Sequence, residues 1–175
     1  MDFMDVVMTR RSVRRFDPEK KPAASDADRL LKCAMYAPSA HNRRPWEFLA
    51  VSEPEMLVEI ARIHPYCKFL PDAGLGIVVC ADLDKQYRTP DGAGYWMVDC
   101  AAASENILLA ARNFGLGACW CGVYPDKERM AAFSKLLSLP ENVAPFCLIA
   151  VGSPLAEQGE AKGRFEPEKI HSERW

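Results

Sequence analysis

The feature that most constrains this fold is an uninterrupted apolar run over residues 74–81, Gly-Leu-Gly-Ile-Val-Val-Cys-Ala. The run contains no charged residue and is rich in β-branched side chains, so it predicts a strand that is buried on both faces. A second apolar run over residues 143–151 predicts another buried strand near the end of the chain. The sequence therefore predicts a sheet that other elements must cover.

Those other elements follow from periodicity and from capping residues. Apolar residues at helical spacing predict helices over about residues 3–9, 25–37, 54–61, 95–114 and 127–137. Ser25 and Asp126 are the expected N-caps, and Gly115 is the expected C-cap. Residues 47–51 predict a further strand, residues 82–94 a polar flap, and residues 115–122 a glycine-rich loop. We expect one domain over residues 1–175, whose polar tail (residues 155–175) lies across another surface.

Composition excludes several classes of protein. The formal net charge is −2, so a general nucleic-acid partner is not expected. No apolar run approaches the roughly 18 residues of a membrane span. The start, Met1 to Asp5, lacks the basic region of a signal peptide, so we expect a cytoplasmic protein without a membrane partner.

The seven cysteines do not form a recognisable metal or disulfide pattern. The three histidines are scattered and no second cysteine pair stands at zinc spacing, so we expect neither a metal site nor a disulfide framework. Cys119 and Cys121 form a C-x-C pair, for which strand packing is favoured over a redox role.

The strongest functional signal is the basic stretch over residues 10–16, Arg-Arg-Ser-Val-Arg-Arg-Phe, directly behind the first predicted helix. Arginine forms bidentate, charge-assisted hydrogen bonds with phosphate, and serine adds a neutral donor. The stretch therefore indicates a phosphate pocket. The alternative is a solvated basic face at a helix C-terminus, where the macrodipole favours cations.

Three further motifs follow the basic stretch in order. The first is residues 38–46, Pro-Ser-Ala-His-Asn-Arg-Arg-Pro-Trp, and the second is residues 115–122, Gly-Leu-Gly-Ala-Cys-Trp-Cys-Gly, behind a long helix that contains Glu105-Asn106. The third is the tail, with Lys162-Gly163-Arg164 and residues 170–175. Together the four motifs span the chain, which resembles a small member of the FMN-dependent nitroreductase family.

This resemblance implies an α+β fold with a mixed, mainly antiparallel sheet flanked by helices, in a homodimer with exchanged C-terminal tails. It implies FMN as cofactor, NADH or NADPH as reductant, and a small electron-poor acceptor such as a nitro compound or a quinone, in a ping-pong cycle. FMN carries the redox chemistry, so no catalytic side chain is expected. The cofactor-binding residues that the resemblance implies are Arg10, Arg11, Ser12, Arg14, Pro38, Ser39, Ala40, Asn42, Trp120, Cys121, Gly122, Lys162 and Arg164.

Within that set, Arg10, Ser12, Arg14, Lys162 and Arg164 are expected around the FMN phosphate and ribityl chain, with Arg11 in the same motif. Residues 38–42 are expected to reach the flavin from the other subunit, and residues 120–122 to lie beside its ring. Many relatives have glutamine where this chain has Arg44, so a contact at that position does not transfer.

Three alternative functions stay open: a relative that dehalogenates substrates or degrades flavin, a flavin-binding storage or regulatory protein, and a C-x-C metal or thiol-redox protein.

Overall fold

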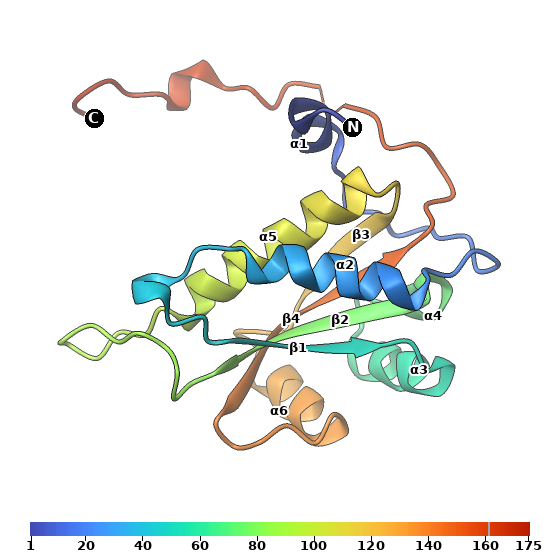
Figure 1. The fold of residues 1–175 in the computed structure, drawn as a ribbon, viewed down its shortest axis with the longest axis horizontal. Helices are drawn as coiled ribbons and strands as arrows, with labels where there is room; N and C mark the ends of the chain where they lie inside the picture. The colour runs from blue at the N-terminus through green and yellow to red at the C-terminus, as the bar shows by residue number, and fades with distance from the viewer. Residues whose placement is uncertain (161) are drawn as a thin grey trace.

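The computed structural model describes residues 1–160 and 162–175. Its centre is a four-stranded sheet in the order β1-β2-β4-β3 (Figure 1). The strands are β1 (Trp46–Val51), β2 (Leu75–Asp82), β3 (Gly117–Gly122) and β4 (Val143–Gly152). All neighbouring strands are antiparallel, which confirms the predicted α+β class with a mainly antiparallel sheet.

The two apolar runs form the central strands β2 and β4, as predicted. Every residue of β2 except Asp82 is buried, and so is every residue of β4 except Val143. Pairing is regular from Leu75↔Val151 to Val79↔Cys147 and then shifts, so that Cys80 faces Pro145. Proline offers no amide hydrogen to a neighbouring strand, and the irregularity lies where this donor is missing.

Five of the six α-helices in the described residues cover the two faces of the sheet (Figure 1). One face carries α2 (Ala24–Met35) and α5 (Trp96–Asn113), which pack on alternate strand residues such as Ile77 and Ile149. The other face carries α3 (Pro54–Ile63), α4 (Leu70–Ala73) and α6 (Lys127–Leu136), which pack on the intervening residues, such as Val78 and Leu148. The remaining helix, α1 (Phe3–Thr9), lies beside the C-terminal part of α5.

Of the three predicted helix caps, Asp126 is confirmed, Gly115 lies one residue beyond the observed C-cap Phe114, and Ser25 is wrong. Asp126 caps α6 by accepting a hydrogen bond from the backbone amide of Arg129. Gly115 follows α5 with a left-handed φ of 79°, a conformation that glycine adopts without steric cost. The prediction of Ser25 as the N-cap of α2 was wrong. The N-cap is Ala23, whose amide donates to the carboxylate of Asp26 at 3.0 Å, so Asp26 satisfies this amide from inside the helix.

The prediction of a loop over residues 115–122 was also wrong for most of its length. Residues Gly117–Gly122 form β3, which pairs with β4 from Gly117↔Gly152 to Gly122↔Cys147. Strand β3 is the last strand of the sheet, so only one of its edges is paired with β4. The three glycines weaken the strand signal in the sequence, and pairing with the long buried strand β4 overrides that weak propensity.

The C-terminal tail divides into two parts. Its first part lies on its own chain, where Phe16 bridges Pro154, the Leu155 amide donates to the Arg15 carbonyl at 3.1 Å and Gln158 is buried. Residues 162–175 are exposed and run past α1 to the C-terminus, with one short 3₁₀ turn, η2 (Pro167–Lys169) (Figure 1). Among the helices that the structure describes, none has both the length and the apolar character needed to span a membrane.

Candidate functional site

The basic stretch leaves α1 and runs along the outer edge of β3. Ser12 forms a parallel bridge with Ala118, and the Val13 amide donates to the Ala118 carbonyl at 2.9 Å. This approach depends on Gly117, because a Cβ at that position would lie 2.9 Å from the Val13 Cβ. The structure thus brings the basic stretch and the glycine-rich motif of residues 115–122 side by side.

Four guanidinium groups gather where the basic stretch meets the tail; we call Arg10, Arg11, Arg112 and Arg164 the arginine cluster. The Arg112 Nε donates to the Thr9 hydroxyl at 2.8 Å, and its Nη2 donates to the Gln158 carbonyl at 3.1 Å. The Arg10 Nε lies 3.5 Å from the Glu105 carboxylate. Arg112 was not predicted from the sequence, because a single arginine in the last turn of a helix is equally explained by the macrodipole.

The guanidinium group of Arg11 is only partly hydrogen-bonded. Its Nη1 donates to the Arg10 carbonyl at 2.6 Å, but its Nη2 is buried and has no hydrogen-bond partner among the described residues. Burial, followed by the neighbouring charges of Arg164 and Arg10, lowers the pKa of Arg11, while Glu160 acts in the opposite direction. A buried, unpaired donor amid like charges is costly, and an anion would remove that cost.

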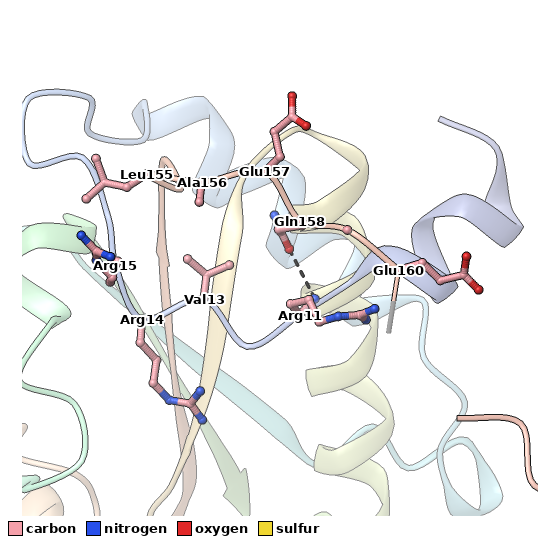
Figure 2. A pocket seen from close by; sticks show the side chains of 10 residues that line it. Arg11, Val13, Arg14, Arg15, Leu155, Ala156, Glu157, Gln158 and Glu160 are labelled. Carbon is pink, nitrogen blue, oxygen red and sulfur yellow. Dashed lines mark hydrogen bonds between the residues drawn. The ribbon is translucent and has the colours of Figure 1, made fainter. Parts of the chain in front are cut away.

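A cavity of about 610 Å³ opens between the basic stretch and the tail (Figure 2). Gln158 ties the tail to the basic stretch and to the residue before β3. The Gln158 Oε1 accepts from the Arg11 amide at 3.3 Å, and the Gln158 Nε2 donates to the Leu116 carbonyl at 3.1 Å. Figure 2 shows Arg11 extending toward Glu160, while the Arg14 side chain points to the opposite side of the stretch. The lining residues are Arg11, Val13, Arg14, Arg15, Leu155, Ala156, Glu157, Gln158, Gly159 and Glu160.

Arg14 belongs to a different neighbourhood from the arginine cluster. Arg14 lines the same cavity as Arg11, but its side chain points to the other side of the stretch (Figure 2), and its charge acts on the thiols of Cys119 and Cys121 in β3. The stretch therefore directs two cations in different directions, Arg11 toward the tail and Arg14 toward β3. Ser12 lies between them and is exposed.

The C-terminal part of β3 presents one aromatic ring, one buried thiol and one accepting carbonyl. Trp120 is half-buried and meets Phe146 edge to face, with ring centroids 5.5 Å apart. The exposed Gly122 has its carbonyl fixed by the His64 Nε2 at 3.0 Å and the Arg129 Nη1 at 2.9 Å.

The thiols of β3 are unsuited to redox chemistry. A hydrogen bond with Cys119 lowers the pKa of Cys121, but contact with Cys67 and burial outweigh it and raise that pKa to about 12. The pKa of Cys119 is raised by its contact with Cys121 and by burial. Both remain thiols at neutral pH, and thiolates are the reactive form. Cys67, which contacts Cys121, is fully buried. Within the described residues no group of three histidine, cysteine or acidic side chains is placed to hold a metal.

The motif of residues 38–46 lies at the other end of α5. Pro38 is exposed, Ala40 begins the 3₁₀ turn η1 (Ala40–Asn42), and the Ala40 amide donates to the buried Asp99 carboxylate at 2.8 Å. Asp99 lies near the N-terminus of α5 and Arg112 near its C-terminus. At a rise of 1.5 Å per residue, about 20 Å of helix separates the two residues. One chain therefore does not bring Pro38, Ser39, Ala40 and Asn42 to the arginine cluster.

The two tail residues predicted to bind a cofactor are both exposed. Arg164 is close enough to Arg11 to lower its pKa, so the two ends of the chain do meet at the arginine cluster. Lys162 makes no hydrogen bond or ion pair with any other described residue. Gln158 was missed by sequence reasoning because nothing in the polar run around it distinguishes a buried amide from a solvated one.

Comparisons with known proteins agree on one family. The sequence model of the Nitroreductase family matches residues 7–68 and 61–153. A protein of Archaeoglobus fulgidus, provisionally named NADH dehydrogenase/NAD(P)H nitroreductase, is 43% identical over 174 residues, which cover 98% of each chain.

Solved structures resemble the whole chain as well. One from Clostridium acetobutylicum, provisionally described as an NADH oxidase, has a TM-score of 0.90 and 37% identity, covering 98% of this chain and 100% of its own. An FMN-dependent nitroreductase from Clostridium difficile R20291 has a TM-score of 0.87 and 27% identity, covering 98% of this chain and 99% of its own.

Proposed function

The chain belongs to the nitroreductase family, and from this premise we propose that it is an FMN-dependent oxidoreductase that uses NADH or NADPH to reduce small electron-poor acceptors. The relatives' names support this proposal, since they include NAD(P)H nitroreductases and an FMN-dependent nitroreductase. Nitro compounds and quinones are the proposed acceptors. We further propose that donor and acceptor use one site in turn, and that residues 1–175 form a single domain.

The observation that carries the proposal is the unpartnered Nη2 of Arg11 within the arginine cluster. A phosphate monoester carries between one and two negative charges at neutral pH and presents several acceptor oxygens. Such a group would pair Arg11, offset its repulsion with Arg164 and Arg10, and fit the 610 Å³ cavity that Arg11 lines. The residues present therefore suit the phosphate of FMN.

The rest of the cofactor is expected along β3. Ser12 and Arg14 follow the β3 edge away from the arginine cluster, toward Trp120, Cys121 and Gly122. When bound, FMN supplies the hydride chemistry. The chain binds and orients it, and places the cation of Arg14 on the ring side of the site, where negative charge is favoured. We assign no catalytic side chain.

We also propose a homodimer in which each flavin contacts both chains. The loop of Pro38, Ser39, Ala40 and Asn42 is about 20 Å of helix away from the arginine cluster of its own chain. A second copy is required if both sets of residues are to contact one cofactor. The exposed tail, with Lys162 and Arg164, is the segment proposed to cross between subunits.

The test is anaerobic reduction of the purified protein. We expect flavin absorbance that is bleached by NADH or NADPH and restored by a nitroaromatic compound or a quinone. Flavin that stays oxidised with both nicotinamides would instead support a storage or regulatory protein. We expect Arg10→Ala combined with Arg14→Ala to fold and to lose FMN, whereas unchanged flavin content would contradict the assigned site.

A further inference from the structure

A second basic surface lies at the opposite end of α5 from the arginine cluster. It consists of residues 38–45, which we call the arginine loop, and residues 87–95, which we call the tyrosine hairpin. Figure 1 shows both segments at the same end of the molecule, beyond the N-terminus of α5. The His41 ring stacks on Tyr87 with centroids 4.0 Å apart and an interplanar angle of 24°, and Tyr87 lies 5.6 Å from Tyr95. The surface therefore offers stacked aromatic rings.

The arginine loop is held in an unusual conformation. His41, Asn42 and Arg44 have left-handed φ angles of 51°, 52° and 48°, which side-chain-bearing residues rarely adopt. Such conformations persist only where the surroundings enforce them, and they concentrate at binding sites. Here the Ser39 hydroxyl accepts from the Arg44 amide at 2.9 Å, and Asp99 accepts from Ala40 at 2.8 Å.

Asp99 shows that this anchoring is costly. It is 2% exposed, and its Oδ2 has no hydrogen-bond partner among the described residues. Burying a carboxylate with only one oxygen paired lowers stability. The loss of stability falls at the position where the Asp99 carboxylate fixes the backbone of the arginine loop through Ala40.

The surface carries an excess of positive charge. Arg43, Arg44 and Arg88 are exposed, and none of them forms an ion pair with another described residue. The only carboxylate in the two segments is Asp91, which accepts a hydrogen bond from the Thr89 hydroxyl. The guanidinium groups of Arg43 and Arg44 are thus available to an anion on the same surface as the exposed rings of His41 and Tyr95.

We propose that this surface binds the adenosine end of the nicotinamide donor and selects NADPH over NADH. Aromatic faces stack on a purine, and arginine pairs bidentately with phosphate. NADPH differs from NADH by one phosphate on the adenosine ribose, so unpaired arginines beside a stacking platform favour NADPH. This inference rests on the proposed function. In the proposed dimer, the same loop contacts the flavin of the partner, which puts the surface within reach of a donor bound there.

The experiment is anaerobic stopped-flow reduction of the FMN-loaded protein with each nicotinamide, giving an apparent dissociation constant and a limiting rate. We expect wild type to bind NADPH more tightly than NADH. Arg43→Ala combined with Arg44→Ala should lower this NADPH/NADH selectivity about tenfold, as expected for loss of charge-assisted hydrogen bonds. His41→Ala should weaken both donors, because adenine is common to them. Arg62→Ala, which changes an exposed side chain of α3, is the matched control and should leave both constants unchanged.

The outcomes separate this inference from the proposed function. Wild type that neither nicotinamide reduces would refute the proposed function itself. Reduction by both donors, with selectivity unchanged in the double variant or with both donors weakened equally by it, would overturn the inference alone. If the double variant loses flavin, Arg44→Gln and Arg88→Gln remove one charge each at similar length, and unchanged selectivity in both would overturn it equally.

Discussion

Arg11 links the stability of the protein to its affinity for a cofactor. Its buried Nη2 lacks a partner and its charge is repelled by Arg164 and Arg10, so the residue is unfavourable in the protein alone. Residues kept for binding often carry such a cost. The arginine is explained by what it binds and not by what it adds to the fold.

We expect Arg11→Ala to change the stability of the protein and its FMN affinity in opposite directions. We expect the apoprotein to be as stable as wild type or more stable, because the variant removes a buried nitrogen that has no hydrogen-bond partner and a charge that Arg164 and Arg10 repel. We expect FMN affinity to fall at least tenfold, since one charge-assisted hydrogen bond contributes about 1.5–3 kcal/mol. Urea denaturation and flavin titration measure the two effects, with Lys20→Ala as the control on an exposed side chain. A loss of stability with unchanged FMN affinity would show that Arg11 is a structural residue.

His64 predicts a pH dependence of stability. The imidazole is 1% exposed, its Nε2 donates to the Gly122 carbonyl and its Nδ1 accepts from the Tyr66 amide at 3.3 Å, so both nitrogens are used by the neutral form. Burial is the main cause that lowers its pKa, and the nearby Arg129 adds to it. The folded protein therefore takes up this proton at a lower pH than the unfolded chain does.

The direction of the pH dependence follows from this difference in the pKa of His64 between the folded and unfolded chain. As pH falls below about 6.5, the unfolded chain gains the proton first, and the free energy of unfolding drops by up to about 1.4 kcal/mol per pH unit until the folded pKa is passed. Above that range His64 contributes no pH dependence. Urea denaturation at pH 7.5 and pH 5.5 measures the effect, and His64→Gln should show a smaller difference between the two pH values. An equal difference in both proteins would assign the acid sensitivity to other groups.

The edge of β3 is the element on which the arrangement of the basic stretch depends. Gly117 leaves room for Val13, whose Cβ and methyl groups lie 2.9–3.0 Å from where a Cβ at position 117 would be. Gly117→Ala should therefore push the basic stretch away from β3, cost about 1–3 kcal/mol and weaken FMN binding. Val13→Ala in the same chain removes two methyl groups and should restore part of both losses. An additive double-mutant cycle, measured by urea denaturation and flavin titration, would show that the two residues do not share this contact.

The same element shows what could be predicted from sequence. Central strands and amphipathic helices have patterns that arise within one segment, and they were predicted close to their observed bounds. Strand β3 and the packing of Gln158 depend on partners far away in the chain, to which local propensity is blind. The conformation of the arginine loop has the same origin, since the Asp99 carboxylate that fixes its backbone lies on a different element.

Candidate site residues could be named in advance only where several polar groups stand together in one motif. Arg112 is a single residue in a helix, so its place in the arginine cluster appears only once α5 is packed against α1. The approach of Arg164 to Arg11 was expected because the resemblance linked the tail to the basic stretch.

The whole molecule exposes several large apolar side chains on one surface. Along α1, Phe3 is 69% and Met4 is 56% exposed, and near the end of α2 Tyr36 is 80% exposed. Phe3 and Tyr36 line a largely apolar cavity of about 530 Å³ between α1, α2 and α5. Contiguous apolar patches of this kind mark interaction surfaces.

The tail is the segment whose removal tests the proposed dimer. Phe165 is 78% exposed, Ile170 is 63% exposed and Trp175 is fully exposed, so the chain that carries them gives these side chains no core to join. Burying three such side chains against a partner contributes about 1.5–3 kcal/mol each, and a chain that ends after Gly159 loses all of that contribution. We expect this truncated protein to dissociate to monomers at micromolar concentration and to lose FMN, because it also lacks Lys162 and Arg164.

Light scattering after gel filtration, with flavin absorbance recorded on the same column, measures both properties. The full-length double variant Phe165→Ala and Ile170→Ala keeps Lys162 and Arg164. It should weaken the dimer more than it weakens FMN binding, when binding is measured at a protein concentration high enough to keep the variant dimeric. A truncated protein that elutes as a flavin-loaded monomer would contradict tail exchange, since one chain would then hold its cofactor without the segment proposed to cross between subunits.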